Sequence, residues 1–244
     1  MNQQTMHDYE LLEALGGGKY SRVCRALDKV NKREVAIKKV DLSLIDPKAE
    51  LQALKDLSLG STAYVVRLHN YFYDDDQDPH YMYIVLDIVQ GITINTLINK
   101  WADEMDQNKE RSLILVWVLI GHLLRAVNYL HNELYAHNDL HGDNIFWDGS
   151  TIKIIDFGYA RPIQDPDYDV LHDKVFVKNT ITNLANWYDP DIVTESHTNI
   201  IGYYQDEQMA KFIHQLAQSF DEPIKINDLL VKYNQFDRLM SNLV

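Results

Sequence analysis

The sequence is short of cysteine, of basic residues and of long apolar runs. Its single cysteine, Cys24, cannot form an internal disulfide, which favours a reducing compartment. Lysine and arginine number 23 against 36 acidic residues, and the net charge of −13 disfavours nucleic-acid binding and docking on anionic membranes. The longest apolar run, residues 113–120, is too short to span a bilayer, and residues 1–12 lack the apolar core of a secretion signal. We therefore expect a soluble cytoplasmic protein that binds no nucleic acid and inserts into no membrane.

Glycine and proline are also scarce. With 10 glycines and 6 prolines among 244 residues, the chain is neither fibrous nor dominated by linkers. Apolar residues make up 46% and charged residues 24%, which is ordinary for a globular protein and excludes disorder as the main state. The length allows one or two domains.

The apolar pattern divides the chain into two parts near residues 89–93. The first part is rich in predicted strands, at residues 9–15, 22–27, 34–40, 64–72 and 81–89, with one helix at 49–57 after Asp46-Pro47. The second part is mainly helical, with helices predicted at residues 93–101, 111–134, 208–219 and 226–243 and short strands at 144–147 and 152–155. This separation predicts an α+β fold with two lobes rather than a doubly wound sheet.

A glycine cluster, Gly16-Gly17-Gly18, lies between the first two predicted strands. Glycines allow the backbone to approach a ligand closely, and exposed N–H groups favour anionic oxygens. The cluster is not a Walker A loop, because Tyr20 follows Lys19 where that motif has Ser or Thr and then a helix. The alternative is a plain hairpin turn.

Lys38 interrupts an otherwise apolar predicted strand. A buried ammonium group is strongly destabilising without a partner, so an acidic residue is expected nearby. Glu50, near the N-terminal end of the next helix, is the best candidate. The alternative is a lysine that points to solvent.

Two polar segments follow the long predicted helix. One is His-Asn-Asp-Leu-His-Gly-Asp-Asn at residues 137–144, and the other is Asp-Phe-Gly at residues 156–158. Asp139, Asn144 and Asp156 offer oxygen ligands around a short hairpin, and Mg²⁺ commonly binds one or two carboxylates together with substrate phosphates. The alternative for each isolated aspartate is a turn cap, but the ordered combination argues against it.

In these four patterns the chain resembles the eukaryotic-type protein kinase family, closely over about residues 9–160 and weakly beyond. The resemblance implies one catalytic domain with a bilobal fold. Its N-lobe, rich in β-strands, would span residues 9–89, and its mainly helical, reduced C-lobe would span residues 90–244. It also implies an enzyme that uses ATP and Mg²⁺, with Mn²⁺ as an alternative ion.

The resemblance implies a role for each matched residue. Lys38 would hold the α- and β-phosphates of ATP and pair with Glu50, and Asp139 would orient the acceptor hydroxyl and accept its proton. Asn144 and Asp156 would bind Mg²⁺. The other nucleotide contacts would be the glycine-rich loop (Gly16, Gly17, Gly18, Ser21), the adenine pocket (Val23, Ala36, Phe146), the gatekeeper Leu86 and the hinge (Asp87, Ile88, Val89). A hydrophobic column between the lobes would contain Leu54, Leu68, His137 and Phe157.

The chain also departs from the family pattern. Asn138 stands where most protein kinases have an arginine that pairs with an activation-loop phosphate, so phosphorylation of that loop should have little control here. His141 stands where Ser/Thr kinases usually have a lysine at the γ-phosphate, and the loop is closer to haspin-type and small-molecule kinases. Residues 187–191 take the place of the Ala-Pro-Glu anchor, and the usual Asp-x-Trp-x-x-Gly helix is not visible.

Three functions stay open at this point. The first is a Ser/Thr protein kinase that acts on protein substrates and phosphorylates itself, with Ser21, Thr180 and Thr182 as candidate positions. The second is a small-molecule kinase of the choline or aminoglycoside type, and the third is a pseudokinase that binds nucleotide without transfer. Because compact kinases occur among bacterial and viral proteins, an effector with partners in a host cytosol is a further alternative.

Overall fold

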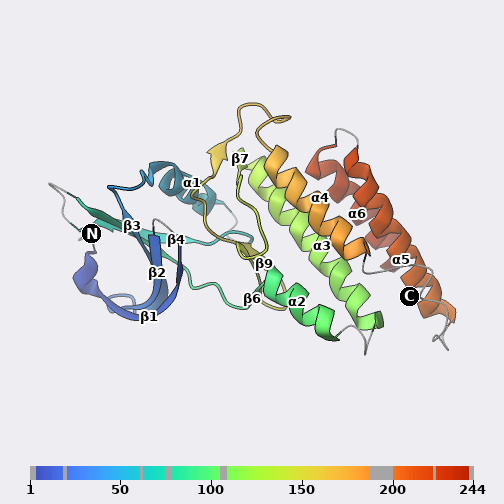
Figure 1. The fold of residues 1–244 in the computed structure, drawn as a ribbon, viewed down its shortest axis with the longest axis horizontal. Helices are drawn as coiled ribbons and strands as arrows, with labels where there is room; N and C mark the ends of the chain where they lie inside the picture. The colour runs from blue at the N-terminus through green and yellow to red at the C-terminus, as the bar shows by residue number, and fades with distance from the viewer. Residues whose placement is uncertain are drawn as a thin grey trace.

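The computed structural model describes residues 4–18, 21–60, 63–74, 79–104, 109–186, 200–221 and 224–241 of the chain. Its longer strands gather in one part and most of its helices in another (Figure 1). This arrangement confirms the predicted α+β fold.

Five antiparallel strands form the sheet of the first part. They are β1 (Tyr9–Gly17), β2 (Ser21–Asp28), β3 (Arg33–Asp41), β4 (Leu68–Tyr73) and β5 (Tyr81–Leu86). Their order across the sheet is β1-β2-β3-β5-β4. β4 begins later than predicted because Val65 forms a bridge with Ile154 of the second part instead of extending the sheet.

One helix, α1 (Lys48–Leu59), accompanies this sheet (Figure 1). Its buried apolar residues match the predicted helical spacing and are Leu51, Ala53, Leu54 and Leu57. The Asp46-Pro47 pattern predicts Asp46 as the N-cap and Pro47 as the first helical residue, whereas in the structure Pro47 is the N-cap and the helix begins at Lys48. Asp46 still caps this end, since its Oδ1 accepts the N–H of Lys48 at 3.1 Å.

Two small sheets lie between the five-stranded sheet and the long helices (Figure 1). One contains β6 (Ile92–Thr93), β8 (Ile145–Trp147) and β9 (Ile152–Ile154), in the order β6-β8-β9. The other pairs β7 (Tyr135–Ala136) with β10 (Arg161–Pro162). These short strands carry the polar segments identified in the sequence.

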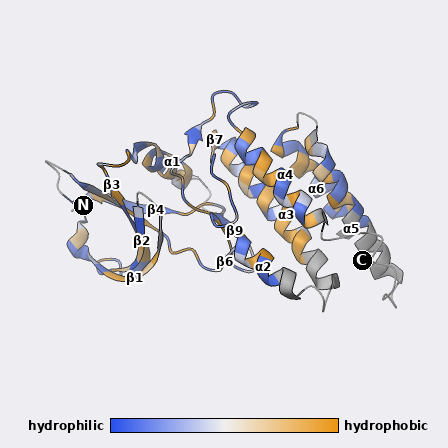
Figure 2. Cartoon of the chain, viewed as in Figure 1, coloured by the Kyte–Doolittle hydropathy of each residue, from blue (hydrophilic) through white to orange (hydrophobic). Residues whose placement is uncertain are grey.

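The second part is built around a long central helix, α3. The helices are α2 (Ile94–Glu104), α3 (Lys109–Asn132), α4 (Leu171–Asn186), α5 (Ile200–Gln218) and α6 (Ile226–Ser241), with short 3₁₀ helices η1 (Met6–Asp8) and η3 (Ser219–Asp221). α3 contacts α4, α5 and α6, and apolar residues are frequent along α3 and α4 (Figure 2). Trp117 stacks on Tyr233 with 4.2 Å between ring centroids, and Phe212 stacks on Phe236 at the same distance. Among the described helices, none combines the length and hydropathy of a membrane span.

Helix α4 is the main element that the sequence patterns did not define. It begins soon after the Asp-Phe-Gly segment, where a longer loop was expected. Thr180 and Thr182 therefore lie in a helix, and Thr180 is buried with 8% of its surface exposed. This burial disfavours Thr180 as a self-phosphorylation position, and its modification stays a prediction.

Gly91, which connects β5 to β6, provides a test of the close packing against β8 in the β6-β8-β9 sheet. Its φ is +102°, and a Cβ there would overlap with the carbonyl group of Trp147. Gly149 has a similar φ of +100°, but nothing lies within 4 Å of its Cβ position. Gly91→Ala should lower the free energy of unfolding by about 3 kcal/mol, and the control Gly149→Ala by about 1 kcal/mol. Equal losses in urea denaturation would contradict the close packing at Gly91.

Candidate active site

The ammonium group of Lys38 lies between two carboxylates from distant parts of the chain. Its Nζ is 2.5 Å from Glu50 Oε1 on α1 and 2.9 Å from Asp156 Oδ1, just after β9. Lys38 and Glu50 are buried, with 8% and 6% of their surfaces exposed, whereas 47% of the Asp156 side chain is exposed. Lys38 therefore does not point to solvent. The cluster has one side open to a ligand, at Asp156.

Opposing effects set the charges of this cluster. Burial disfavours the charge of Lys38, but Glu50 and Asp156 outweigh it and raise the pKa of Lys38. Burial raises the pKa of Glu50 against the attraction of Lys38. Burial also opposes the charge of Asp156, yet the charge and hydrogen bond of Lys38 lower the pKa of Asp156. Lys38 is thus a cation and Asp156 an anion at neutral pH.

The predicted adenine contacts of the sheet lie around Lys38. Val23 on β2 is directly opposite Lys38, and Ala36 on β3 is directly opposite Leu86 on β5. Residues directly opposite each other share a face of a sheet, as do residues two apart on one strand. The side chains of Val23, Ala36, Lys38 and Leu86 therefore line one face.

Gly16 and Gly17 end β1, where they pair with Val23 and Arg22 of β2, and Gly18 follows them. The N–H of Gly18 donates to the carbonyl oxygen of Ser21 at 3.0 Å, and Gly16, Gly17 and Gly18 are exposed. Lys19 and Tyr20 lie outside the described residues. The three glycines thus lie exposed at the end of β1, as both sequence interpretations allow.

The remaining predicted nucleotide contacts lie at the junction of the two parts. Phe146 is half-buried on β8, and Val89 is half-buried in the segment between β5 and β6. At the start of that segment, His69 Nε2 lies 2.5 Å from Asp87 Oδ1, and the N–H of Asp87 donates to the carbonyl of Arg67 at 3.0 Å. The side chain of Asp87 is therefore directed toward β4.

Hydrogen bonds connect the loop of Asp139 to the strand that leads to Asp156. His137 Nε2 donates to the carbonyl of Ile155 at 3.0 Å, so its Nδ1 accepts the N–H of Asp139 at 3.3 Å. Burial lowers the pKa of His137, which keeps the ring neutral in this tautomer. Asn144 Nδ2 donates to the backbone carbonyl of Asp139 at 3.0 Å. The backbone carbonyl of Asn144 accepts the N–H of Ile155 at 2.9 Å. One network thus holds the backbone of the predicted base Asp139, the side chain of the predicted metal ligand Asn144, and the residue before Asp156.

Asp173 is a buried residue of the site that the sequence patterns did not reveal. It lies in the first turn of α4 with no exposed surface. Its Oδ2 and Oδ1 accept the N–H groups of His137 and Asn138, each at 2.9 Å, and His131 Nε2 lies 3.1 Å from Oδ2. Asn138 has a left-handed φ of 62°, a conformation that persists only where the surroundings fix it. Asp173 supplies that constraint.

His141 shows a different environment from the other predicted catalytic residues. Its side chain is 48% exposed, and its Nδ1 accepts the N–H of Asp143 at 3.3 Å. The contacts described for His141 are within its own loop, so the structure does not bring it to the Lys38 cluster. Its proposed place near the γ-phosphate stays a prediction.

The segment before α4 is short and held by carboxylates. Asp169 accepts the N–H groups of Gln164 at 2.7 Å and Asp165 at 2.8 Å, and β10 pairs with β7. Residues 158–170 contain no serine or threonine. Residues 187–191, the expected anchor, lie outside the described residues.

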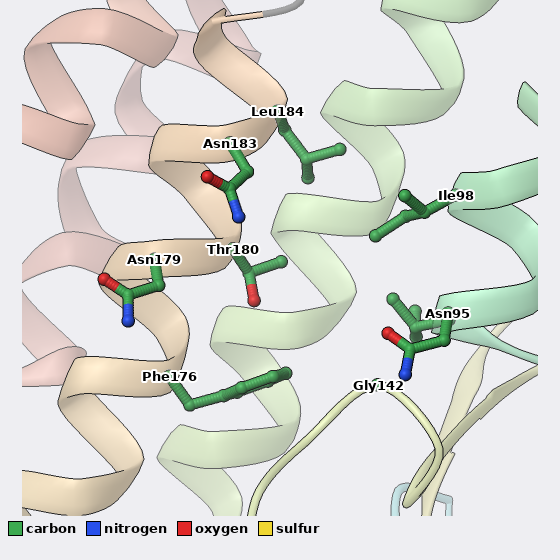
Figure 3. Close-up of a pocket in the computed structure, with 9 residues that line it drawn as sticks. Asn95, Ile98, Gly142, Phe176, Asn179, Thr180, Asn183 and Leu184 are labelled. Atoms are coloured by element: carbon green, nitrogen blue, oxygen red, sulfur yellow. The ribbon is translucent and has the colours of Figure 1, made fainter. Parts of the chain in front are cut away.

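A cavity of about 380 Å³ lies beside the loop of residues 137–144, which is named the catalytic loop because it contains Asp139, the predicted base (Figure 3). Its described lining is uncharged and comes from α2, α4 and the loop: Ile94, Asn95, Ile98, Gly142, Phe176, Asn179, Thr180, Asn183 and Leu184. The N–H of Asn95 donates to the carbonyl of Gly142 at 3.3 Å, and Asn95 Nδ2 donates to Asp143 Oδ2 at 2.9 Å. Asn95, which lines the cavity, is therefore hydrogen-bonded to the loop that contains Asp139.

Asn144 and Asp156 fit a magnesium ion bound together with phosphates. Asp156 is anionic and partly exposed, and the amide nitrogen of Asn144 is engaged by Asp139, which leaves its oxygen as an acceptor. Within the described ranges, no group of three or more His, Cys, Asp or Glu side chains could hold a metal by itself. Two oxygen ligands completed by substrate phosphates are a common arrangement for Mg²⁺.

Substitution of Asp173 tests whether this carboxylate organises the catalytic loop. Asp173→Asn leaves one oxygen acceptor for two backbone N–H groups, so the free energy of unfolding should fall by about 2–4 kcal/mol. Asp169→Asn is the matched control, because it removes a carboxylate that also accepts two N–H groups but lies at the surface. Urea denaturation should show a clearly smaller loss for the control. A stable Asp173→Asn protein would show that the loop is fixed by other contacts.

Comparison with known proteins agrees with this geometry. The family described as protein kinase domain matches residues 9–216. Similar proteins include a putative ribosomal protein S6 kinase alpha-1 of Caenorhabditis elegans, 30% identical over 159 residues that cover 63% of this chain and 19% of that protein. The probable serine/threonine-protein kinase fhkA of Dictyostelium discoideum is 29% identical over 66% of this chain and 27% of its own length. The serine/threonine-protein kinase ppk23 of Schizosaccharomyces pombe is 29% identical over 66% of this chain and 39% of its own length.

The chain thus spans between about a fifth and two fifths of the length of these relatives. The family match, in contrast, covers most of the chain and includes both parts of the fold. The match and the Lys38, Glu50 and Asp156 cluster together identify the chain as a member of the eukaryotic-type protein kinase family.

Proposed function

We propose that the chain is a Ser/Thr protein kinase that transfers the γ-phosphoryl group of Mg·ATP to hydroxyl groups of proteins. One observation carries the proposal: Lys38 contacts both Glu50 and Asp156, although Asp156 is 118 residues away in the sequence. In protein kinases the lysine–glutamate pair and the aspartate of Asp-Phe-Gly must both be in place for transfer. The relatives described above are all named as kinases, and two are named as serine/threonine-protein kinases.

Each residue of the site has a physical task in this reaction. Lys38 binds the α- and β-phosphates, and Glu50 holds its ammonium group in place. Asn144 and Asp156 hold Mg²⁺, which when bound neutralises charge on the phosphate oxygens. Asp139, fixed through His137 and Asn144, orients the acceptor hydroxyl and accepts its proton. Positioning and charge neutralisation provide most of the catalysis.

A small-molecule acceptor is the second candidate. Two observations favour it: His141 replaces the usual lysine, and an uncharged cavity lies next to Gly142 in the catalytic loop. The names of the relatives favour a protein acceptor. A pseudokinase is the weakest alternative, because Lys38, Asp139 and Asp156 are all present and two of them are in contact.

Self-phosphorylation and location complete the proposal. Ser21, half-buried at the start of β2, is the candidate self-phosphorylation site closest to the glycine cluster. The single cysteine and the acidic composition support a reducing, cytoplasmic setting, which would be a host cytosol if the protein is a delivered effector. Partners other than ATP and the acceptor protein are not indicated by these residues.

Replacement of Asp139 tests the proposed reaction. Asp139→Asn keeps the shape of the side chain but removes the proton acceptor, so the transfer rate should fall by about 10²–10⁴-fold. The measurement is transfer of label from radioactive ATP to generic protein substrates and to the chain itself. Asp167→Asn, at an exposed position before α4, is the control and should retain activity. Label appearing only on small alcohols would support the second candidate, and nucleotide binding without any transfer would support a pseudokinase.

Phosphatase treatment tests control by phosphorylation. Asn138 cannot pair with a phosphate as arginine does, and residues 158–170 offer no serine or threonine. We therefore expect the purified protein to keep most of its transfer activity after complete dephosphorylation, which mass spectrometry would verify. Loss of activity, restored by rephosphorylation, would show that a phosphate elsewhere orders the site.

A further inference from the structure

A buried tyrosine joins helix α1 to the strand before the catalytic loop. The hydroxyl of Tyr135 donates to Asp56 Oδ2 at 2.6 Å, and only 7% of the Tyr135 surface is exposed. The other oxygen of Asp56 accepts from Gln52 Nε2 at 2.8 Å. Burial and the neighbouring Asp56 raise the pKa of Tyr135 to about 12, so the hydroxyl keeps its proton at neutral pH. Hydrogen bonds from Tyr135 and Gln52 thus hold both side-chain oxygens of Asp56.

The two partners lie on the two halves of the active site. Tyr135 belongs to β7, two residues before His137, and β7 also pairs with β10 after the Asp-Phe-Gly segment. Asp56 lies on α1, six positions after Glu50, which corresponds to about 9 Å along a helix axis. A rigid helix transmits a displacement at Asp56 to Glu50.

Other contacts also hold α1 in place. The buried residues Leu54 and Leu57 attach α1 to the core, but apolar packing is non-directional. Two further hydrogen bonds lie at the same end of α1: the hydroxyl of Tyr129 donates to the backbone carbonyl of Leu57 at 3.0 Å, and the N–H of Leu68 donates to Ser58 Oγ at 3.0 Å. Of these described bonds, only the one from Tyr135 involves the strand that leads directly into the catalytic loop.

We propose that Tyr135 is a positioning residue, which through its hydrogen bond to Asp56 holds α1 where Glu50 can pair with Lys38. The same bond sets the distance between α1 and the catalytic loop. The expected effect on nucleotide binding rests on the proposed function, whereas the coupling between Tyr135 and α1 does not.

The test uses the full chain and four proteins: wild type, Tyr135→Phe, Glu50→Gln and the double variant. Tyr135→Phe should weaken binding of Mg·ADP in calorimetry by about three- to tenfold, the effect of one hydrogen bond. In the Glu50→Gln background the same substitution should change binding by less than about twofold, because Tyr135 acts through Glu50. Equal factors in both backgrounds would overturn the proposal, since a general loss of stability would act alike in both.

Amide hydrogen exchange provides a readout that does not need nucleotide. In Tyr135→Phe, amides of residues 48–59 should exchange faster than in the wild type. The matched control is Tyr233→Phe, which removes another buried hydroxyl, bonded to the carbonyl of Trp117 at 3.0 Å on α3. This control should leave exchange in α1 and Mg·ADP binding unchanged. Unchanged exchange of α1 in Tyr135→Phe, or equal acceleration in both variants, would overturn the proposal.

The two readouts separate failure of this inference from failure of the proposed function. If the wild type binds no Mg·ADP, the proposed function fails, and the exchange of α1 alone decides the role of Tyr135. If the wild type binds Mg·ADP and Tyr135→Phe changes neither binding nor exchange, only the role of Tyr135 is wrong.

Discussion

The buried charge of Lys38 is the constraint on which the rest of the structure depends. An ammonium group removed from water is strongly destabilising unless carboxylates and hydrogen bonds compensate for the lost hydration. Glu50 comes from α1 and Asp156 from the segment after β9, so neither part of the fold satisfies Lys38 alone. The sheet, the helix and the polar segments must therefore assemble together. Breaking one contact leaves a buried charge with a single partner.

Backbone N–H groups of the catalytic loop impose a second constraint. The amides of His137 and Asn138 are directed to the interior, where only a buried acceptor can satisfy them. Asp173 provides both acceptor oxygens, whereas a single oxygen of Asp169, Oδ2, accepts the N–H groups of Gln164 and Asp165. These two carboxylates therefore hold the backbone of residues 137–138 and 164–165. They support the proposal that phosphorylation has little control here, which was first drawn from Asn138.

Local patterns predicted most of the first part of the fold. Strand alternation indicated all five strands, and the leucine spacing indicated α1. A lysine in an apolar strand implied a buried partner, and Glu50 is that partner. In the second part, Val177, Ile181 and Leu184 have the apolar spacing of a helix in α4, but the family's Asp-x-Trp-x-x-Gly pattern, which would have indicated a helix, does not occur there. The helix was therefore missed, and with it the acceptor of the loop amides.

Contacts between distant residues were beyond the reach of local patterns. Tyr135 and Asp56 are 79 residues apart, and neither has an unusual sequence neighbourhood. The later start of β4, at Leu68, was also not predictable, because Val65 pairs with Ile154 of the second part. Periodicity reports which face of an element is buried, but not which hydroxyl meets which carboxylate.

The charge balance of the site also limits what it can bind. One ammonium group, Lys38, is surrounded by the carboxylates of Glu50 and Asp156. The chain as a whole carries a net charge of −13, so a free nucleotide triphosphate meets little attraction beyond Lys38. A divalent cation held by Asn144 and Asp156 reverses the local sign, since a bound ion is often the largest charge in such a site. If the proposed function holds, Mg²⁺ would therefore contribute to nucleotide affinity as well as to the chemistry of transfer, and the exposed side of Asp156 would contact the ion.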